Sequence, residues 1–208
     1  MKRFFLLFLI VLTVFAFIAC KNEVAAEKEK DEVKPAEPIT EPGVLFVRPA
    51  ADCTWDDETD KGKFQFKLDV EFNANESIDL YAKFAKDVTE VAVRQAFGGN
   101  VKFKVNGAEY LQLEDLEQDE DGWYIVSIPA ASVLPTDSGA PVEKWSGLGI
   151  SVHLPDEKKA GCFIAIKGLK LGDQYFDITD WDEDSCAEPY YGKPSGLDVV
   201  LTLPTEQE

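Results

Sequence analysis

Apolar and polar residues alternate one by one in several short segments of this chain. Residues 64–72 read FQFKLDVEF, and residues 78–84 and 101–105 repeat the same pattern. An alternation of period two is typical of a β-strand with one buried and one solvated face. Further strands are expected at the other apolar segments, which are residues 123–128, 148–154, 162–171 and 197–203.

Turn-forming residues separate these segments, at Gly98-Gly99-Asn100, Asn106-Gly107, Asp121-Gly122 and Gly172-Asp173. Residues 88–97 are ambiguous, because Asp87 and Glu90 could cap a helix. The three valines of that segment are β-branched and favour a strand. Many short strands with no strand–helix alternation predict an all-β fold, an antiparallel β-sandwich (jelly roll) of about eight or nine strands.

The N-terminal residues have a different composition. Lys2 and Arg3 precede an apolar segment that runs from Phe4 to Ile18 and is interrupted only by Thr13. An apolar segment this short, at the very start of a chain, fits a signal peptide better than a permanent membrane span. Residues 1–20 are therefore expected to direct export from the cytoplasm.

The end of this segment, Phe17-Ile18-Ala19-Cys20, resembles the lipobox of bacterial lipoproteins, although Phe17 stands where leucine is usual. The resemblance implies that Cys20 is lipidated and anchors the protein to the cell envelope, on the periplasmic side or at the cell surface. Acyl chains anchor a protein by burying their methylene groups in the bilayer. The alternative is an ordinary secretory signal that contains a cysteine.

Residues 21–42 are rich in Lys, Glu, Ala and Pro and show no apolar periodicity. Such a segment buries too little surface to offset the entropy lost on ordering, so a disordered tether is expected. About 165 residues follow from Gly43 to Glu208, which is enough for one domain with a substantial core.

Acidic residues strongly outnumber basic ones. The chain has 39 Asp and Glu against 21 Lys and Arg, a formal net charge of −18, which becomes −20 once Lys2 and Arg3 are removed with the signal peptide. A surface this acidic repels nucleic acid and anionic lipid headgroups. It leaves carboxylates available for cations such as calcium.

The sequence favours a binding protein over an enzyme. His153 is the only histidine, so a zinc cluster or a Ser-His-Asp triad would have to use it. Its place in the segment 148–154 instead favours a polar residue on the solvated face of a strand. No glycine-rich phosphate-binding loop is present.

Three cysteines follow Cys20, which allows one disulfide and one free thiol in an exported protein. Cys162 opens the apolar segment CFIAI and is expected to be a buried thiol. Cys53 and Cys186 lie in polar, acidic segments and are the expected disulfide pair, with the other pairings left open.

A disulfide between them would bring the acidic segments 52–60 and 179–186 together. Crowded carboxylates suit calcium, so a structural Ca²⁺ is a candidate cofactor. The alternative is two solvated acidic loops. The candidate ligands are Asp56, Asp57, Asp60, Asp180, Asp182 and Asp184.

Several aromatic residues lie where no core demands them. A flat exposed ring near carboxylates and amides binds the apolar face of a sugar, but aromatic rings also close the ends of a sandwich. Trp123 and Trp145 begin apolar segments and are expected in the core. The candidate ligand-binding residues are Trp55, Trp181, Tyr190, Tyr191 and, on the solvated side of its strand, Tyr81.

Four segments together resemble carbohydrate-binding modules with a galactose-binding-like jelly roll: IDLYAKFAKDVTEVAVRQ, DGWYIVSIPAASVL, KWSGLGISVHL and GCFIAIKGLKLGD. They cover most of residues 62–175 and carry strand patterns rather than ligand-binding motifs, so no binding residue is transferred. The sequence thus predicts a lipid-anchored extracytoplasmic protein that binds carbohydrate or polysaccharide without catalysis. The alternative is a protein-interaction or adhesin lipoprotein that uses the sandwich as a scaffold.

Overall fold

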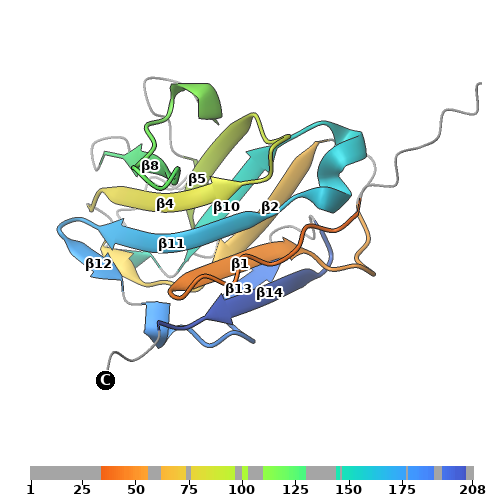
Figure 1. Cartoon of the computed structure of the whole chain (residues 1–208). Helices are drawn as coiled ribbons and strands as arrows, with labels where there is room; N and C mark the ends of the chain where they lie inside the picture. The colour runs from red at the N-terminus through yellow and green to blue at the C-terminus, as the bar shows by residue number, and fades with distance from the viewer. Residues whose placement is uncertain are drawn as a thin grey trace, which may run out of the picture. The chain divides into compact units, whose positions relative to one another are not determined.

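The computed structural model shows a domain of β-strands and short 3₁₀ helices (Figure 1). It describes residues 34–55, 62–73, 76–96, 100–102, 110–129, 144–145, 147–176, 178–189 and 194–204. No helix within these residues has the length and apolar composition to cross a membrane. The expected signal peptide, the lipidation site Cys20 and the first part of the tether lie outside the described residues.

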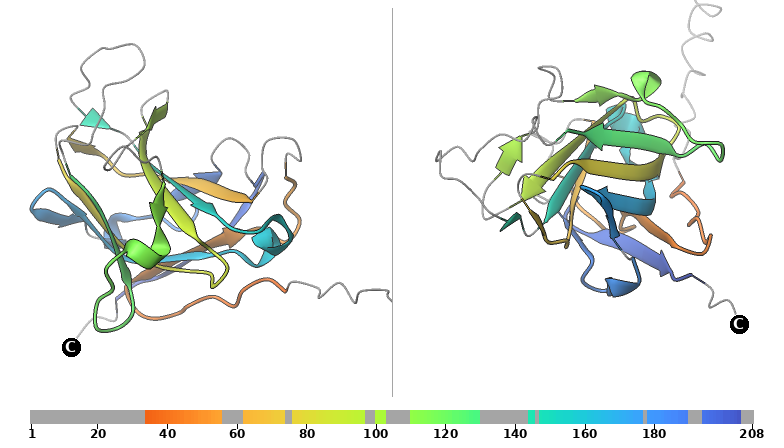
Figure 2. Two further views of the ribbon diagram at one scale, coloured as in Figure 1. Left: turned by 90° about the horizontal axis from the view of Figure 1, so that it is seen from above. Right: turned by 90° about the vertical axis from the view of Figure 1, so that its left-hand side faces the viewer.

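Two six-stranded antiparallel sheets form the sandwich (Figure 2). Across the first sheet lie β14 (Leu197–Thr202), β1 (Val44–Pro49), β11 (Ile164–Leu171), β4 (Ile78–Phe84) and β8 (Tyr124–Ile128), with β12 (Gln174–Phe176) paired to β11. Across the second lie β13 (Ala187–Pro189), β2 (Lys63–Leu68), β10 (Leu148–His153), β5 (Glu90–Ala96) and β6 (Asn100–Lys102), with β7 (Leu111–Gln112) paired to β5.

Shorter elements complete the domain. A separate ladder joins β3 (Phe72–Asn73) to β9 (Lys144–Trp145), and the 3₁₀ helices are η1 (Leu113–Asp115), η3 (Asp156–Gly161) and η4 (Ile178–Asp180). The predicted all-β antiparallel sandwich is confirmed, and the ambiguous segment 88–97 forms a strand, β5. The strands outnumber the expected eight or nine because several contain only two or three residues, too few for alternation to reveal.

The core lies between the two sheets and follows the predicted alternation. In β4 every second residue from Ile78 to Phe84 is buried, while the residues between them are partly exposed. In β2 the side chains of Phe64, Phe66 and Leu68 are fully buried on the facing sheet. Strands with one apolar face bury it against the opposite sheet, which makes this layer pairing stable.

The expected single strand at residues 64–72 is divided. The chain leaves the second sheet after Leu68, and it pairs again only at β3, with β9. Val70 and Phe72 stay buried across the break. The Asp69 amide donates to the Cys186 carbonyl at 2.9 Å, so the loop before β13 takes the place of a sheet partner.

A second apolar cluster covers the outer face of the first sheet. Its buried members are Val44, Phe46, Trp123 and Ala165. Phe163 stacks on Phe46 with ring centroids 5.2 Å apart. Trp123 is therefore buried, as expected, but it lies outside the sandwich core rather than between the sheets. The side chain of Trp145, the other expected core tryptophan, lies outside the described part of the chain.

Residues 34–42, expected to belong to the disordered tether, pack against this outer cluster. Ala36 and Ile39 are half-buried on it. Arg48 donates to the Ala36 carbonyl and also to the Asp198 carboxylate, at 2.7 Å through Nε. These contacts attach residues that precede the expected boundary at Gly43 to the β-sandwich.

Candidate functional site

Two tyrosines lie side by side on the outer face of the first sheet. Tyr81 in β4 and Tyr175 in β12 have ring centroids 6.4 Å apart and planes inclined by 32°. Tyr175 is 69 % exposed, although it is a large aromatic residue. We call these two residues the tyrosine pair. Tyr81 was expected on the solvated side of its strand, and its partly exposed position agrees with that.

Backbone pairing brings the two rings together. β11 runs between β4 and β12, with Gly168 directly opposite Tyr81 and Lys170 directly opposite Tyr175. A β-bulge at residues 166–168 shifts the register. A Cβ atom built on Gly168 would lie 3.6 Å from Cδ2 of Tyr81, so this ring lies against the bare backbone of β11. A longer side chain at Gly168 would compete for the space beside the ring.

The β11–β12 hairpin holds Tyr175 in place. Leu171 pairs with Gln174, which leaves the two-residue turn Gly172-Asp173 that the sequence indicated. Gly172 has φ of +59°, a conformation that glycine adopts without steric cost. Its amide also donates to the Ser77 carbonyl at 2.8 Å, which ties the turn to the chain just before β4.

The neighbours of Tyr81 keep its hydroxyl group in the neutral form. The hydrogen bond with Tyr175 is the largest cause that raises the pKa of Tyr81, followed by burial and by the charges of Asp79 and Asp119. Hydrogen bonding to the neutral form and nearby negative charge both oppose ionisation. Tyr81 therefore stays a neutral hydrogen-bond donor and acceptor throughout the physiological pH range.

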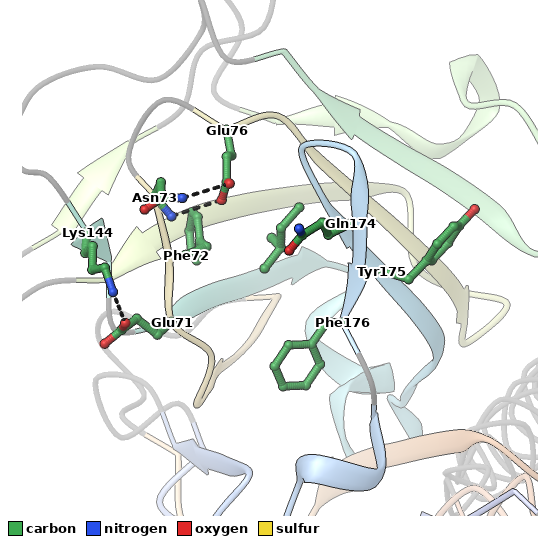
Figure 3. Close-up of a pocket in the computed structure, with 9 residues that line it drawn as sticks. Glu71, Phe72, Asn73, Glu76, Lys144, Gln174, Tyr175 and Phe176 are labelled. Atoms are coloured by element: carbon green, nitrogen blue, oxygen red, sulfur yellow. Dashed lines mark hydrogen bonds and ion pairs between the residues drawn. The ribbon is translucent and has the colours of Figure 1, made fainter.

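A polar hollow of about 210 Å³ lies beside the tyrosine pair, at the end of the sandwich (Figure 3). Its polar side chains form two contacts. Lys144 Nζ lies 2.5 Å from Glu71 Oε1, and Asn73 Nδ2 donates to Glu76 Oε1 at 2.9 Å. The lining residues are Glu71, Phe72, Asn73, Glu76, Lys144, Leu171, Gln174, Tyr175 and Phe176.

Neighbouring residues of β12 face two different surfaces, the polar hollow and the outer face of the sheet. Figure 3 shows Gln174 pointing toward the labelled polar side chains, whereas the Tyr175 ring points away from them. Successive side chains of a strand face opposite sides, so one short strand can present an amide to the hollow and an aromatic ring to the outer face. The two surfaces meet at this strand.

Trp181 was expected to be an exposed ligand-binding residue, and that expectation is wrong. It is only 7 % exposed and packs on Phe176 with ring centroids 5.1 Å apart. Its indole N–H donates to the Asp69 carbonyl at 3.1 Å. A buried tryptophan needs such a partner for its polar atom. Trp181 borders a second hollow of about 380 Å³, but its ring belongs to the core.

Trp55, another candidate aromatic residue, does not join the tyrosine pair. Trp55 is half-buried against the core, with Lys159 Nζ 4.9 Å from its ring centroid. One face of that ring is thus occupied by a cation. Tyr190 and Tyr191 lie outside the described residues.

The expected Cys53–Cys186 disulfide is absent, because Cys53, Cys162 and Cys186 are all free thiols in the structure. Cys53 lies in the turn after β1, near Gly196, whereas the buried Cys186 thiol faces the Glu183 carbonyl at 3.8 Å. Burial raises the pKa of Cys186 to about 11. Cys162 is a buried thiol, as expected, and its pKa is also raised by burial.

The acidic loops do not form a metal centre within the described part of the chain. There, no group of three or more His, Cys, Asp or Glu side chains is arranged to hold an ion. The Asp182 carboxylate accepts the Asp184 amide at 3.2 Å and so closes a turn. Asp180 belongs to η4. The remaining candidate ligands, Asp56, Asp57 and Asp60, lie outside the described residues.

His153 lies on the outer face of the second sheet, as expected, but this face is not solvated here, since the ring is only partly exposed and its neighbours Gln65 and Ser151 are buried. Its Nδ1 lies 2.9 Å from a carboxylate oxygen of Glu90, its partner in β5. Tyr110 stacks on the imidazole, with ring centroids 4.1 Å apart. Beside them the buried Gln65 amide donates to Ser151 Oγ at 2.7 Å. This row of polar contacts joins neighbouring strands.

Tyr175 is the site residue that sequence analysis missed. The available signal was the Gly172-Asp173 turn, because a two-residue hairpin loop fixes the pairing of the residues that follow. Counting from that turn places Tyr175 opposite Lys170 and on the same side of the sheet.

The fold and the site thus define an antiparallel all-β sandwich with an exposed aromatic pair on one outer sheet face. No family model, no curated protein and no solved structure matches this chain.

Proposed function

We propose that this protein is a lipid-anchored, extracytoplasmic binding protein that holds a polysaccharide on the tyrosine pair without chemical conversion. The observation that carries the proposal is the exposure of Tyr175 next to Tyr81. Sugar rings have apolar C–H faces, and a flat aromatic ring recognises them by stacking. The lipid anchor rests on the lipobox-like ending at Cys20.

The tyrosine pair is organised before a ligand arrives. Tyr81 lies against the Gly168 backbone, and Tyr175 is carried on a tight hairpin. A side chain that is already ordered loses little conformational entropy when it binds. Tyrosine is also a favourable contact residue in general, because it combines a large ring with only two rotatable bonds.

The polar hollow supplies hydrogen-bonding groups within reach of the same strand. Asn73, Glu76 and Gln174 offer amide donors and carboxylate and amide acceptors. Sugar hydroxyl groups both donate and accept, so mixed amides and carboxylates suit them. The strand β12 thus presents a ring for stacking on one side and the Gln174 amide to the hollow on the other.

The test is calorimetric titration of soluble polysaccharides against the exported chain and two variants. Tyr175→Ala is expected to weaken binding at least tenfold, because most of the stacking surface is lost. Leu203→Ala is the matched control, since Leu203 is also a large exposed residue, 51 % accessible, and follows β14, which β1 separates from β11 in the sheet order. Titrations with calcium and with EDTA will show whether an ion is needed.

The proposal fails if no polysaccharide binds in either condition, or if Tyr175→Ala binds as tightly as the unchanged chain. The anchor is tested separately, by mass spectrometry of the mature N-terminus. A lipid-modified Cys20 is expected, and a mature protein that retains residues 1–19 would contradict it.

A further inference from the structure

The charges around the tyrosine pair are mixed in sign, whereas the whole chain is strongly acidic. The chain has a formal net charge of −18. On the outer face of the first sheet, however, β4 and β11 present three lysines, Lys83, Lys167 and Lys170. Two carboxylates, those of Asp79 and Asp119, lie close enough to raise the pKa of Tyr81.

One of these lysines is neutralised by an acid. Lys167 forms an ion pair with Asp119, and that carboxylate also accepts the amide N–H of Trp123 at 2.9 Å. This contact closes the loop before β8 against β11. Asp119 is therefore already occupied in the protein.

The other two lysines are not neutralised in this way. Lys83 Nζ lies 4.4 Å from the centroid of the Trp123 ring, a cation–π contact that leaves the positive charge in place. Lys170 forms no ion pair in the described part of the chain, although it pairs through the backbone with both Asp79 and Tyr175. Elsewhere Lys67 and Lys144 do have acidic partners, Glu188 and Glu71.

Two positive charges, Lys83 and Lys170, and one negative charge, Asp79, thus lie on the face that carries the tyrosine pair. Lys83 follows Tyr81 by two residues in β4, so both side chains point the same way. Lys170 faces Tyr175 across the β11–β12 hairpin. A sugar ring stacked on these tyrosines would hold the substituents at its edge near an ammonium group on either side.

We infer that the polysaccharide recognised by the tyrosine pair carries carboxylate groups, as polymers of uronic acids do. This inference rests on the proposed function and names the class of its ligand. The uronate ring stacks on a tyrosine, and its carboxylate pairs with Lys170 or Lys83. The negative charge of the remaining surface is screened beyond about 8 Å at physiological ionic strength, so these local contacts decide recognition.

The inference is tested by removing the charge from the ligand while keeping its backbone. The probes are polygalacturonate and alginate, each beside its esterified form, in 0.15 M salt with EDTA to prevent calcium cross-linking. The exported full chain is used. Both carboxylated polymers are expected to bind more tightly than their esterified forms, and raising the salt concentration should weaken only the carboxylated ones.

Variants assign the effect to the site. Lys170→Gln is expected to weaken binding of the carboxylated polymers about two- to fivefold, the range of an exposed ion pair, and to leave the esterified forms unaffected. Lys63→Gln is the matched control, because it removes the same charge from β2 in the other sheet. It should change neither.

Each outcome decides between the two claims. Equal binding of carboxylated and esterified polymers, lost in Tyr175→Ala, would overturn the inference and leave the proposed function standing. So would Tyr175-dependent binding of neutral polysaccharides alone. Absence of binding to any carbohydrate would overturn the proposed function, and the inference with it.

Discussion

Replacing Trp181 tests whether this residue belongs to the core or binds a ligand. Trp181 lies in an acidic segment with a cysteine, which suggested an exposed ring for sugar stacking. In the structure the ring is only 7 % exposed and packs on Phe176. We expect Trp181→Ala to destabilise the domain strongly. We expect Tyr175→Ala, at the exposed tyrosine, to leave stability almost unchanged.

The magnitude follows from burial. Truncating a buried tryptophan to alanine removes its contacts and leaves a cavity, which costs about 3–5 kcal/mol of unfolding free energy. Trp181→Phe keeps an aromatic ring against Phe176 but loses the 3.1 Å hydrogen bond to the Asp69 carbonyl. That loss and the smaller ring should cost about 1–2 kcal/mol. An exposed substitution such as Tyr175→Ala should stay within about 0.5 kcal/mol.

The assay is urea unfolding followed by far-UV circular dichroism, because the loss of a tryptophan alters the fluorescence signal itself. Equal slopes of free energy against urea would show that the variants unfold between comparable states. A Trp181→Ala chain within about 1 kcal/mol of the unchanged protein would refute the assignment of Trp181 to the core. A stable Trp181→Ala chain that had lost polysaccharide binding would restore the exposed-ligand interpretation.

Three further predictions follow from the same structure. Ile39→Ala should lower the unfolding free energy by about 1 kcal/mol because Ile39 covers the outer cluster, whereas Glu37→Ala, at an exposed neighbour, should have no effect in the same urea assay. The hydrogen bond with Lys167 is the main cause that lowers the pKa of Asp119. The stabilisation from Asp119 is therefore present above the pKa of the unfolded state and disappears as pH falls through the pKa of the folded state. Asp119→Asn should destabilise the domain at pH 6, and this effect should shrink in unfolding curves below about pH 4. In a Cys20→Ser chain, a thiol reagent should label Cys53 in the native state and reach Cys162 and Cys186 only after unfolding, because both are buried; native labelling of all three would contradict the structure.

The sandwich was predictable because each main strand buries one face. The pattern FQFKL of β2 and the alternation of β4 report that burial directly. The same pattern continues through Phe72, yet the chain leaves the second sheet after Leu68. Alternation registers which side chains are buried, but it does not say which strand provides the hydrogen-bonding partner. The break after Leu68 could therefore not be predicted from the alternation alone.

The outer apolar cluster was not predictable from composition. Residues 34–42 contain few apolar side chains, a composition that favoured a tether. Ala36 and Ile39 nevertheless pack against the outer cluster that contains Phe46 and Trp123. The Arg48 guanidinium adds a hydrogen bond to the Ala36 carbonyl. Such contacts depend on a face formed by strands that are far apart in the sequence, so no local pattern contains them.

The candidate site shows the same limit. Trp181 and Tyr175 both lie in polar surroundings along the chain, yet one is buried and the other exposed. The indole of Trp181 packs on Phe176 and donates to the Asp69 carbonyl just after β2, whereas Tyr175 projects from a hairpin on the outer face. Whether an aromatic residue is exposed depends on what the fold places over it.

The position of the tyrosine pair on paired strands has a consequence for recognition. Tyr81 is fixed by its pairing with Gly168, and Tyr175 by its pairing with Lys170. Side chains carried on regular strands hold their geometry more closely than side chains on loops. Of the acidic segment 52–60, the described residues 52–55 contribute nothing to this pair or to the polar hollow beside it. Replacing the exposed Asp52 by alanine should therefore leave polysaccharide affinity unchanged. Replacing Gly168 by a larger residue should weaken it by displacing the Tyr81 ring, even though Gly168 offers no side chain to a ligand.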